Sequence, residues 1–224
     1  MSEWWTYRPA NFLLFAPRTY YRLFELYNSE IWPGQVLALL VGLVMLALMR
    51  NRGPSQSRVI SAALAAAWLW VAWAYHYTRY ASINWAATYF AGAFALEALL
   101  LLILGVGRGL DLRAKAGWID RAGVGLVVFA IVLHPLIGPL VGRSWSQVEI
   151  FAIAPDPTVV ATLGVVALAS GWPTWLLLPI PIAWCLLSGA TAWLIHSADA
   201  AMMPLAGLFA LAIAGGSPLA TRLS

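Results

Sequence analysis

Long apolar stretches separated by short polar gaps run through the sequence from residue 32 onward, and most of the charged residues lie in the gaps. A segment inside lipid must satisfy its backbone hydrogen bonds internally, and an α-helix of about 20 apolar residues does so. Only 10% of the residues are charged, against about 25% in a soluble domain. We therefore predict an all-α fold, a polytopic transmembrane helical bundle of about seven spans in a lipid bilayer. The predicted spans are residues 32–49, 59–77, 83–105, 122–141, 157–170, 175–195 and 202–216.

The amino-terminal segment has a different pattern. From Pro17 onward, aromatic and aliphatic residues recur at helical spacing on one face, and Arg18 and Arg22 lie on the opposite stripe. This pattern is typical of an amphipathic helix that lies in the membrane interface. The segment also lacks the basic start and the cleavage site of a signal peptide. We expect an interfacial segment over residues 1–31, followed by a single transmembrane domain over residues 32–224.

Two of the predicted spans are short for a hydrocarbon layer of about 30 Å. Residues 157–170 and 202–216 are therefore expected to be extended, tilted or partly re-entrant. Prolines inside the fourth and sixth predicted spans indicate kinks, which neighbouring helices must accommodate.

Arginine and lysine are distributed unevenly between alternate gaps. The gaps after the first and third predicted spans hold most of them, whereas the gaps between hold Arg79 and Arg143. Cytoplasmic loops are enriched in Arg and Lys, so we expect the amino terminus outside and the carboxyl terminus in the cytoplasm. An odd number of spans agrees with this orientation. The residues that support it are Arg50, Arg52, Arg58, Arg108, Arg113, Lys115, Arg121 and Arg222.

Several functional classes find no support in the sequence. The net charge of +4 does not predict nucleic-acid binding, because the basic residues form neither a patch nor an Arg-rich helix. The single cysteine, Cys185, excludes an internal disulfide and a Cys-based metal centre. There is no G-x-S-x-G, P-loop or dinucleotide-binding motif. An enzyme is not predicted, and no cofactor is identified.

Glu97 has the sharpest functional signal. It lies in the sequence AFALEALLLL, inside the third predicted span. A carboxylate in hydrocarbon costs several kcal/mol, so Glu97 is expected to face the bundle interior, to be protonated, or both. We interpret it as a proton or cation site, as an acid that binds a polar group of a ligand, or as a neutral partner in an interhelical hydrogen bond. Tyr89, eight residues earlier, is expected to line the same cavity.

The three histidines form a second candidate site. In the predicted topology, His76, His134 and His196 all lie toward the outer side of the membrane. Imidazoles at one depth could bind a transition metal or ligate haem, and Asp156 and Asp199 would be nearby oxygen ligands. The alternative is that the histidines are simply interfacial, since two of them lie at predicted helix ends.

Trp68 lies too deep in the second predicted span for an interfacial aromatic belt. It is interpreted either as the lining of a pocket for a flat hydrophobic ligand such as a quinone, or as core packing.

The outer connections are also candidates. Asp156, between two prolines, is expected to cap the fifth span, with Pro157 at the first helical position. Together with Asp199 and Arg79, it would form an outer surface open to a ligand or partner.

Two segments carry a family resemblance. WWTYRPANFLLFAPRTYYRLFELYNSEIWP and APDPTVVATLG resemble a family of bacterial multi-pass membrane proteins that is catalogued as a domain of unknown function. The resemblance implies a bacterial inner membrane, and thus a periplasmic amino terminus. It implies no activity and no catalytic residues.

Three functions remain open. The first is a small-solute or ion carrier that uses Glu97 and the kinked spans. The second is a non-enzymatic accessory subunit that docks on other membrane-protein subunits through its amino-terminal helix and outer loops. The third is a redox, metal-binding or quinone-binding protein that uses the outer histidines.

Overall fold

The computed structural model describes residues 15–112 and 117–220 of the chain. Throughout these ranges the regular structure is helical, which confirms the predicted all-α fold. The α-helices are α1 (Pro17–Glu30), α2 (Gly34–Leu48), α3 (Pro54–Trp70), α4 (Ala87–Leu100), α5 (Trp118–Val128), α6 (His134–Leu140), α7 (Pro155–Leu168), α8 (Pro173–Leu176), α9 (Pro179–Leu194) and α10 (Met202–Ala220).

Three of the long helices change to π-helical geometry partway along. The π segments are η3 (Val71–Tyr77) after α3, η5 (Leu101–Gly109) after α4 and η6 (Phe129–Leu133) between α5 and α6. Short 3₁₀ turns, η4 (Tyr80–Ser82) and η7 (Trp145–Gln147), lie in the connections. A π segment shifts the side chains that follow it around the helix axis, and such segments are frequent at functional sites.

Four helical stretches are long and apolar enough to cross a membrane: Pro54–Ser82, Ala87–Gly109, Trp118–Leu140 and Pro173–Leu194. Helices α1 and α2 meet at 89° and count as a fifth stretch only if this bent pair is one broken span. Helix α7 and the apolar part of α10 are shorter. The chain is therefore membrane-like in its helices, and the number of seven spans stays a prediction.

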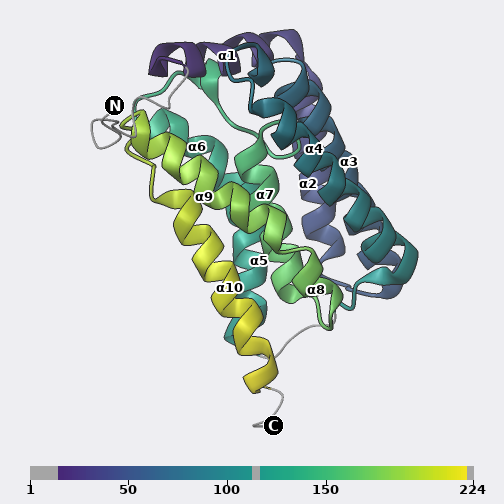
Figure 1. Ribbon diagram of the computed structural model, residues 1–224. Coiled ribbons are helices and arrows are strands. Elements are labelled where there is room, and N and C mark those ends of the chain that lie inside the picture. The colour runs from purple at the N-terminus through teal and green to yellow at the C-terminus, as the bar shows by residue number, and fades with distance from the viewer. Residues whose placement is uncertain (1–14, 113–116, 221–224) are drawn as a thin grey trace, which may run out of the picture.

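Helix α1 lies across one end of the bundle, and the other long helices run away from it (Figure 1). It begins at Pro17, and it buries Leu23, Phe24 and Tyr27 against the bundle. The side-chain amide of Asn28 donates to the backbone carbonyl oxygens of Ser146 and Val148, both at 2.9 Å. The apolar face of this amphipathic helix thus packs on protein, and its place in the membrane interface stays a prediction.

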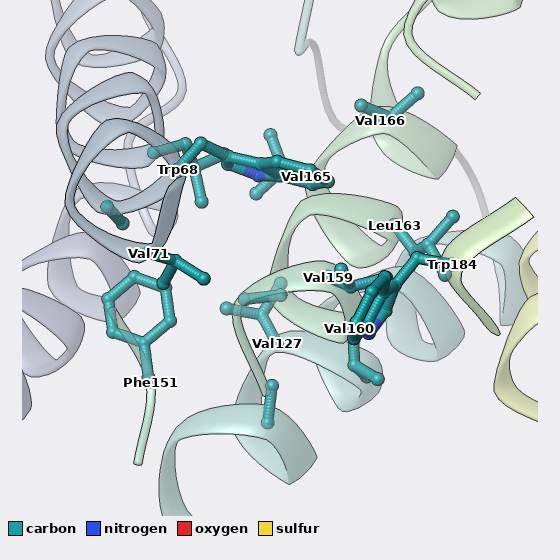
Figure 2. Close-up of a cluster of buried hydrophobic side chains, with 14 of the residues drawn as sticks. Trp68, Val71, Val127, Phe151, Val159, Val160, Leu163, Val165, Val166 and Trp184 are labelled. Carbon is teal, nitrogen blue, oxygen red and sulfur yellow. The ribbon is translucent and has the colours of Figure 1, made fainter. Parts of the chain in front are cut away.

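Helix α7 forms the centre of the fold, and every one of its residues is buried. Its valines and its two leucines belong to the buried core, and Figure 2 shows several of them among side chains from the surrounding segments. Helices α5 and α7 approach closely at two glycines: a Cβ atom on Gly164 would lie 2.8 Å from the carbonyl oxygen of Gly123. Because α7 is enclosed by protein, its length of 14 residues need not match the thickness of a bilayer.

Candidate functional site

A cluster of buried charged side chains lies at the α1 end of the bundle. Asp156 is the second residue of α7, and its carboxylate accepts hydrogen bonds from Trp184 Nε1 at 2.7 Å and Ser188 Oγ at 2.6 Å. Both donors are on α9. The expected capping role is wrong, because α7 begins at Pro155 and its capping residue is Ala154. Asp156 is also only 9% exposed, so it is not part of an open outer surface.

Arg143 joins two further carboxylates in the same cluster. Its guanidinium pairs with Glu149 at 3.0 Å and with Asp199 at 2.6 Å. Asp199 also accepts a hydrogen bond from Ser197 Oγ at 2.5 Å, and Ser197 accepts one from Tyr21 OH at 3.0 Å. This network connects α1, the segment after α6 and the connection between α9 and α10. The carboxylate of Asp199 is therefore occupied by intramolecular partners, and Asp199 does not form part of an open outer surface.

His134, the first residue of α6, completes the cluster. It is 2% exposed, and neither ring nitrogen has a hydrogen-bond partner in the described part of the chain. An imidazole nitrogen of His134, a carboxylate oxygen of Glu149 and a carboxylate oxygen of Asp156 all lie within 4.8 Å of one another. The start of α6 thus brings the imidazole of His134 close to two carboxylates. One of them, Glu149, lies in the connection before α7, and the other, Asp156, lies in the first turn of α7.

The charges in this cluster do not balance. Glu149, Asp156 and Asp199 are three carboxyl groups, and Arg143 is the one guanidinium that pairs with them in the described contacts. Burial raises the pKa of Glu149, and the neighbouring Arg143 acts in the opposite direction. A cavity of about 20 Å³ borders the cluster, which is enough for one water molecule or ion.

The three histidines do not share one site. His76 is fully buried, with its ring 4.4 Å from that of Phe94 and 4.9 Å from that of Trp184. His196 is exposed and has a positive φ of 56° in the connection before α10. The predicted grouping of the three histidines is therefore wrong, because an equal depth along the membrane does not specify where a side chain lies around the bundle. Glu149 was missed, since it lies in a non-helical connection with no motif around it.

Glu97 lies on α4 and is fully buried. Neither carboxylate oxygen has a hydrogen-bond partner within residues 15–112 and 117–220. Tyr89 is 71% exposed, so the expectation that it lines a cavity with Glu97 is wrong. Eight residues along an α-helix leave the two side chains about 80° apart, which is enough to turn one outward.

Trp68 is fully buried, and its Nε1 donates to Thr162 Oγ1 on α7 at 2.7 Å. Its ring lies 4.3 Å from that of Phe94. These contacts describe a packed core residue with a satisfied polar group. A second cavity, of about 50 Å³, lies beside Trp184, Tyr20 and Tyr80, and it is too small for a quinone ring with its substituents.

Arg79 fastens α1 to the bundle. Its guanidinium pairs with Glu30 at 2.5 Å, donates to the Ala74 carbonyl oxygen at 2.7 Å and lies 4.5 Å from the ring centre of Tyr27. These contacts occupy Arg79 with intramolecular partners. Beside it, α1 and the segment after η3 form a groove of about 630 Å³.

The fold and the buried cluster define a class: an all-helical, membrane-like protein with a polar centre at one end of its bundle. The chain belongs to DUF6064, a family of unknown function, whose model matches residues 18–224. This finding confirms the resemblance to a family of unknown function. Neither a comparison with curated proteins nor a comparison with solved structures gave a match.

Proposed function

We propose that the protein is an integral membrane carrier for protons or small cations, with Glu97 as the ion-binding group inside the bundle. The observation that carries the proposal is the complete burial of Glu97 together with two unpartnered oxygens in the described structure. An ionisable residue inside a transmembrane bundle is expensive, and such residues usually mark ion or proton pathways.

The position of Glu97 supports this role. The stretch Ala87–Gly109 is 23 residues long, and the helix rise puts Glu97 about 15 Å from one end and about 18 Å from the other. A carboxylate at this depth is stable only with a bound proton or a bound cation. Exchange of one for the other is the elementary step of a proton-coupled carrier.

The cluster at the α1 end supplies a second cation-attracting position. Its excess of carboxylates over guanidinium groups favours the approach of cations over anions. The π segments and the break between α8 and α9 at Leu177 and Leu178 provide places where helices can bend, as the broken helices of carriers do.

The proposed setting is a bacterial inner membrane, crossed seven times if α2, α7 and α10 are counted as spans. The amino terminus is then periplasmic and the carboxyl terminus cytoplasmic, so that the α1 end faces the periplasm. Arg50 and Arg52 lie in the connection between α2 and α3, Arg58 lies in α3, Arg108 in η5 and Arg121 in α5. The connection between α2 and α3, the end of η5 and the start of α5 lie at the end of the bundle opposite α1 (Figure 1), and this distribution supports the proposed orientation. Arg113, Lys115 and Arg222, which also entered the orientation argument, lie outside the described residues.

The test is flux into liposomes that contain the purified protein. Proton flux is followed with a pH-sensitive dye inside the liposomes, and cation flux with a panel of radioactive ions or fluorescent indicators, under imposed proton and cation gradients. Wild type is expected to give flux well above empty liposomes, and Glu97→Gln is expected to abolish it. Glu30→Gln is the matched control, because the Glu30 side chain is 60% exposed and lies far along the chain from α4.

Unfolding does not confound this comparison. Glu97→Gln removes a buried ionisable group and keeps its shape, so the thermal stability of the variant is expected to equal or exceed that of wild type. Unchanged flux in Glu97→Gln, or no flux in wild type with protons and every cation in the panel, would refute the proposal.

A further inference from the structure

We infer that His134, Glu149 and Asp156 form a binding site for one divalent transition-metal cation, with Zn²⁺ as the probe ion. The inference goes beyond the carrier proposal, because it concerns a different set of residues and a property that is measured without a membrane. Three potential ligand atoms within 4.8 Å of one another are the starting observation.

The spacing is close to that of a metal site. Zn–N and Zn–O bonds of about 2.0–2.2 Å in a tetrahedral site put neighbouring ligand atoms roughly 3.4 Å apart. The three atoms would therefore have to approach one another by at most about 1.4 Å when an ion binds. A fourth position is left for a water molecule, and a cavity of about 20 Å³ borders Glu149 and Asp156.

His134 provides an independent reason to expect a ligand. No hydrogen bond of normal geometry from the described residues reaches either nitrogen of this buried imidazole, although the backbone of Glu149 lies close to it, so its lost hydrogen bonds to water are at best partly replaced, which is unfavourable. A metal ion would occupy one nitrogen. His76 is equally unpartnered, but its ring is surrounded by the rings of Phe94, Trp184, Tyr75 and Tyr80, and it is not part of a group of metal-ligand atoms.

The surroundings would hold the ligands in place. Trp184 and Ser188 each donate to one oxygen of Asp156, and each of these oxygens keeps a further acceptor position. Arg143 fixes Glu149 from the other side. Hydrogen bonds of this kind orient ligands and sustain metal affinity.

The charge and the donor atoms select the class of ion. With His134 neutral and all three carboxyl groups ionised, these carboxylates and Arg143 leave two negative charges uncompensated, and one divalent cation would remove both. One imidazole nitrogen with two carboxylates favours zinc and its transition-metal neighbours over Mg²⁺ or Ca²⁺, which prefer oxygen alone.

The experiment uses the full-length chain in detergent, purified without a histidine tag and stripped with a chelator. Equilibrium dialysis against Zn²⁺ with elemental analysis is expected to give one tightly held ion per chain. Co²⁺ is expected to give the visible bands of a tetrahedral site. His134→Gln should weaken binding by at least about 100-fold, because loss of a supporting residue alone costs 10- to 100-fold.

His196→Gln is the matched control, since it removes an exposed imidazole and should leave the affinity unchanged. A Zn²⁺-dependent rise in melting temperature, present in wild type and lost in His134→Gln, checks that the ion stabilises the folded chain. Absence of stoichiometric binding in wild type, or full affinity in His134→Gln, would overturn the inference. So would a loss of binding in His196→Gln with retention in His134→Gln.

The two proposals fail separately. Glu97→Gln is expected to bind Zn²⁺ with wild-type affinity, because Glu97 is not among the proposed ligands. A negative Zn²⁺ result therefore leaves the flux test of Glu97 standing, and a negative flux result leaves the metal site standing.

Discussion

Substitution of Gly164 by alanine tests the close approach of α5 to the central helix. A Cβ atom on Gly164 would lie 2.7 Å from Val127 Cγ2, 2.8 Å from the Gly123 carbonyl oxygen and 3.0 Å from Leu126 Cβ. Non-bonded carbon atoms prefer separations of about 3.5–4.0 Å. One of the contacts is backbone, so rotation of a side chain cannot relieve it, and the two helices must move apart by roughly 0.5–0.8 Å.

The expected magnitude follows from two opposing effects. Overpacking of a core costs about 1–3 kcal/mol, and a contact with backbone puts this site near the upper end. Replacement of glycine by alanine inside a helix returns about 1 kcal/mol. We therefore expect Gly164→Ala to lower the free energy of unfolding by about 2 kcal/mol, which corresponds to roughly 4–8 °C in melting temperature for a chain of this size.

The assay is unfolding in detergent, by heat and by titration with a denaturing surfactant, followed by circular dichroism. Gly92→Ala on α4 is the control, because its new Cβ would have nothing within 4 Å, and it should be neutral or slightly stabilising. If Gly164→Ala were as stable as wild type or as Gly92→Ala, the close packing of α5 on α7 would be refuted.

Three further substitutions test other contacts. Arg143→Leu should destabilise by about 3–5 kcal/mol in the same unfolding assay, because it leaves the buried carboxylate of Glu149 and the half-buried carboxylate of Asp199 without their cation. Arg22→Leu, at an exposed pair, should cost less than about 1 kcal/mol, and equal effects of the two substitutions would contradict the network around Arg143. Trp68→Phe should cost about 1–3 kcal/mol and leave the Thr162 hydroxyl without its donor, and Thr162→Val in that background should add little; additive losses would rule out the hydrogen bond. Asn28→Ala should make α1 more sensitive to proteolysis, because both hydrogen bonds from the Asn28 side-chain amide to the segment before α7 are lost. An unchanged rate of digestion would contradict the view that these hydrogen bonds hold α1 on the bundle.

Elements with a strong energetic reason were predictable from the sequence. Helical structure follows from the need of apolar segments to satisfy their own backbone, and the burial of Glu97 follows from the cost of exposing a carboxylate to lipid. The start of α1 at Pro17 follows from the tolerance of proline in a first helical turn. Each of these inferences depends on local sequence and on the solvent.

Lateral arrangement was not predictable. The expected union of His76, His134 and His196 used depth along the membrane, and neighbours at one depth can lie on different sides of a bundle. Tyr89 was placed beside Glu97 although the helix rotates one away from the other. The neighbouring prolines predicted that Asp156 caps a helix, but its carboxylate accepts hydrogen bonds from Trp184 and Ser188 on α9. These two partners are separated from Asp156 by 28 and 32 positions in the sequence.

The unbalanced charges around Asp156 weigh against a purely structural role for the cluster. Buried ion pairs contribute little net stability, and hydrophobic side chains of similar volume often do better. The positive end of α7 offsets only about half a charge near Asp156, and Arg143 already serves two other carboxylates. Packing alone would favour apolar residues at this end of α7, as in most of the rest of that helix, where Thr158 and Thr162 are the polar residues. The buried carboxyl groups of Glu149 and Asp156 beside the unpartnered imidazole of His134 therefore agree with the proposal that a cation binds there.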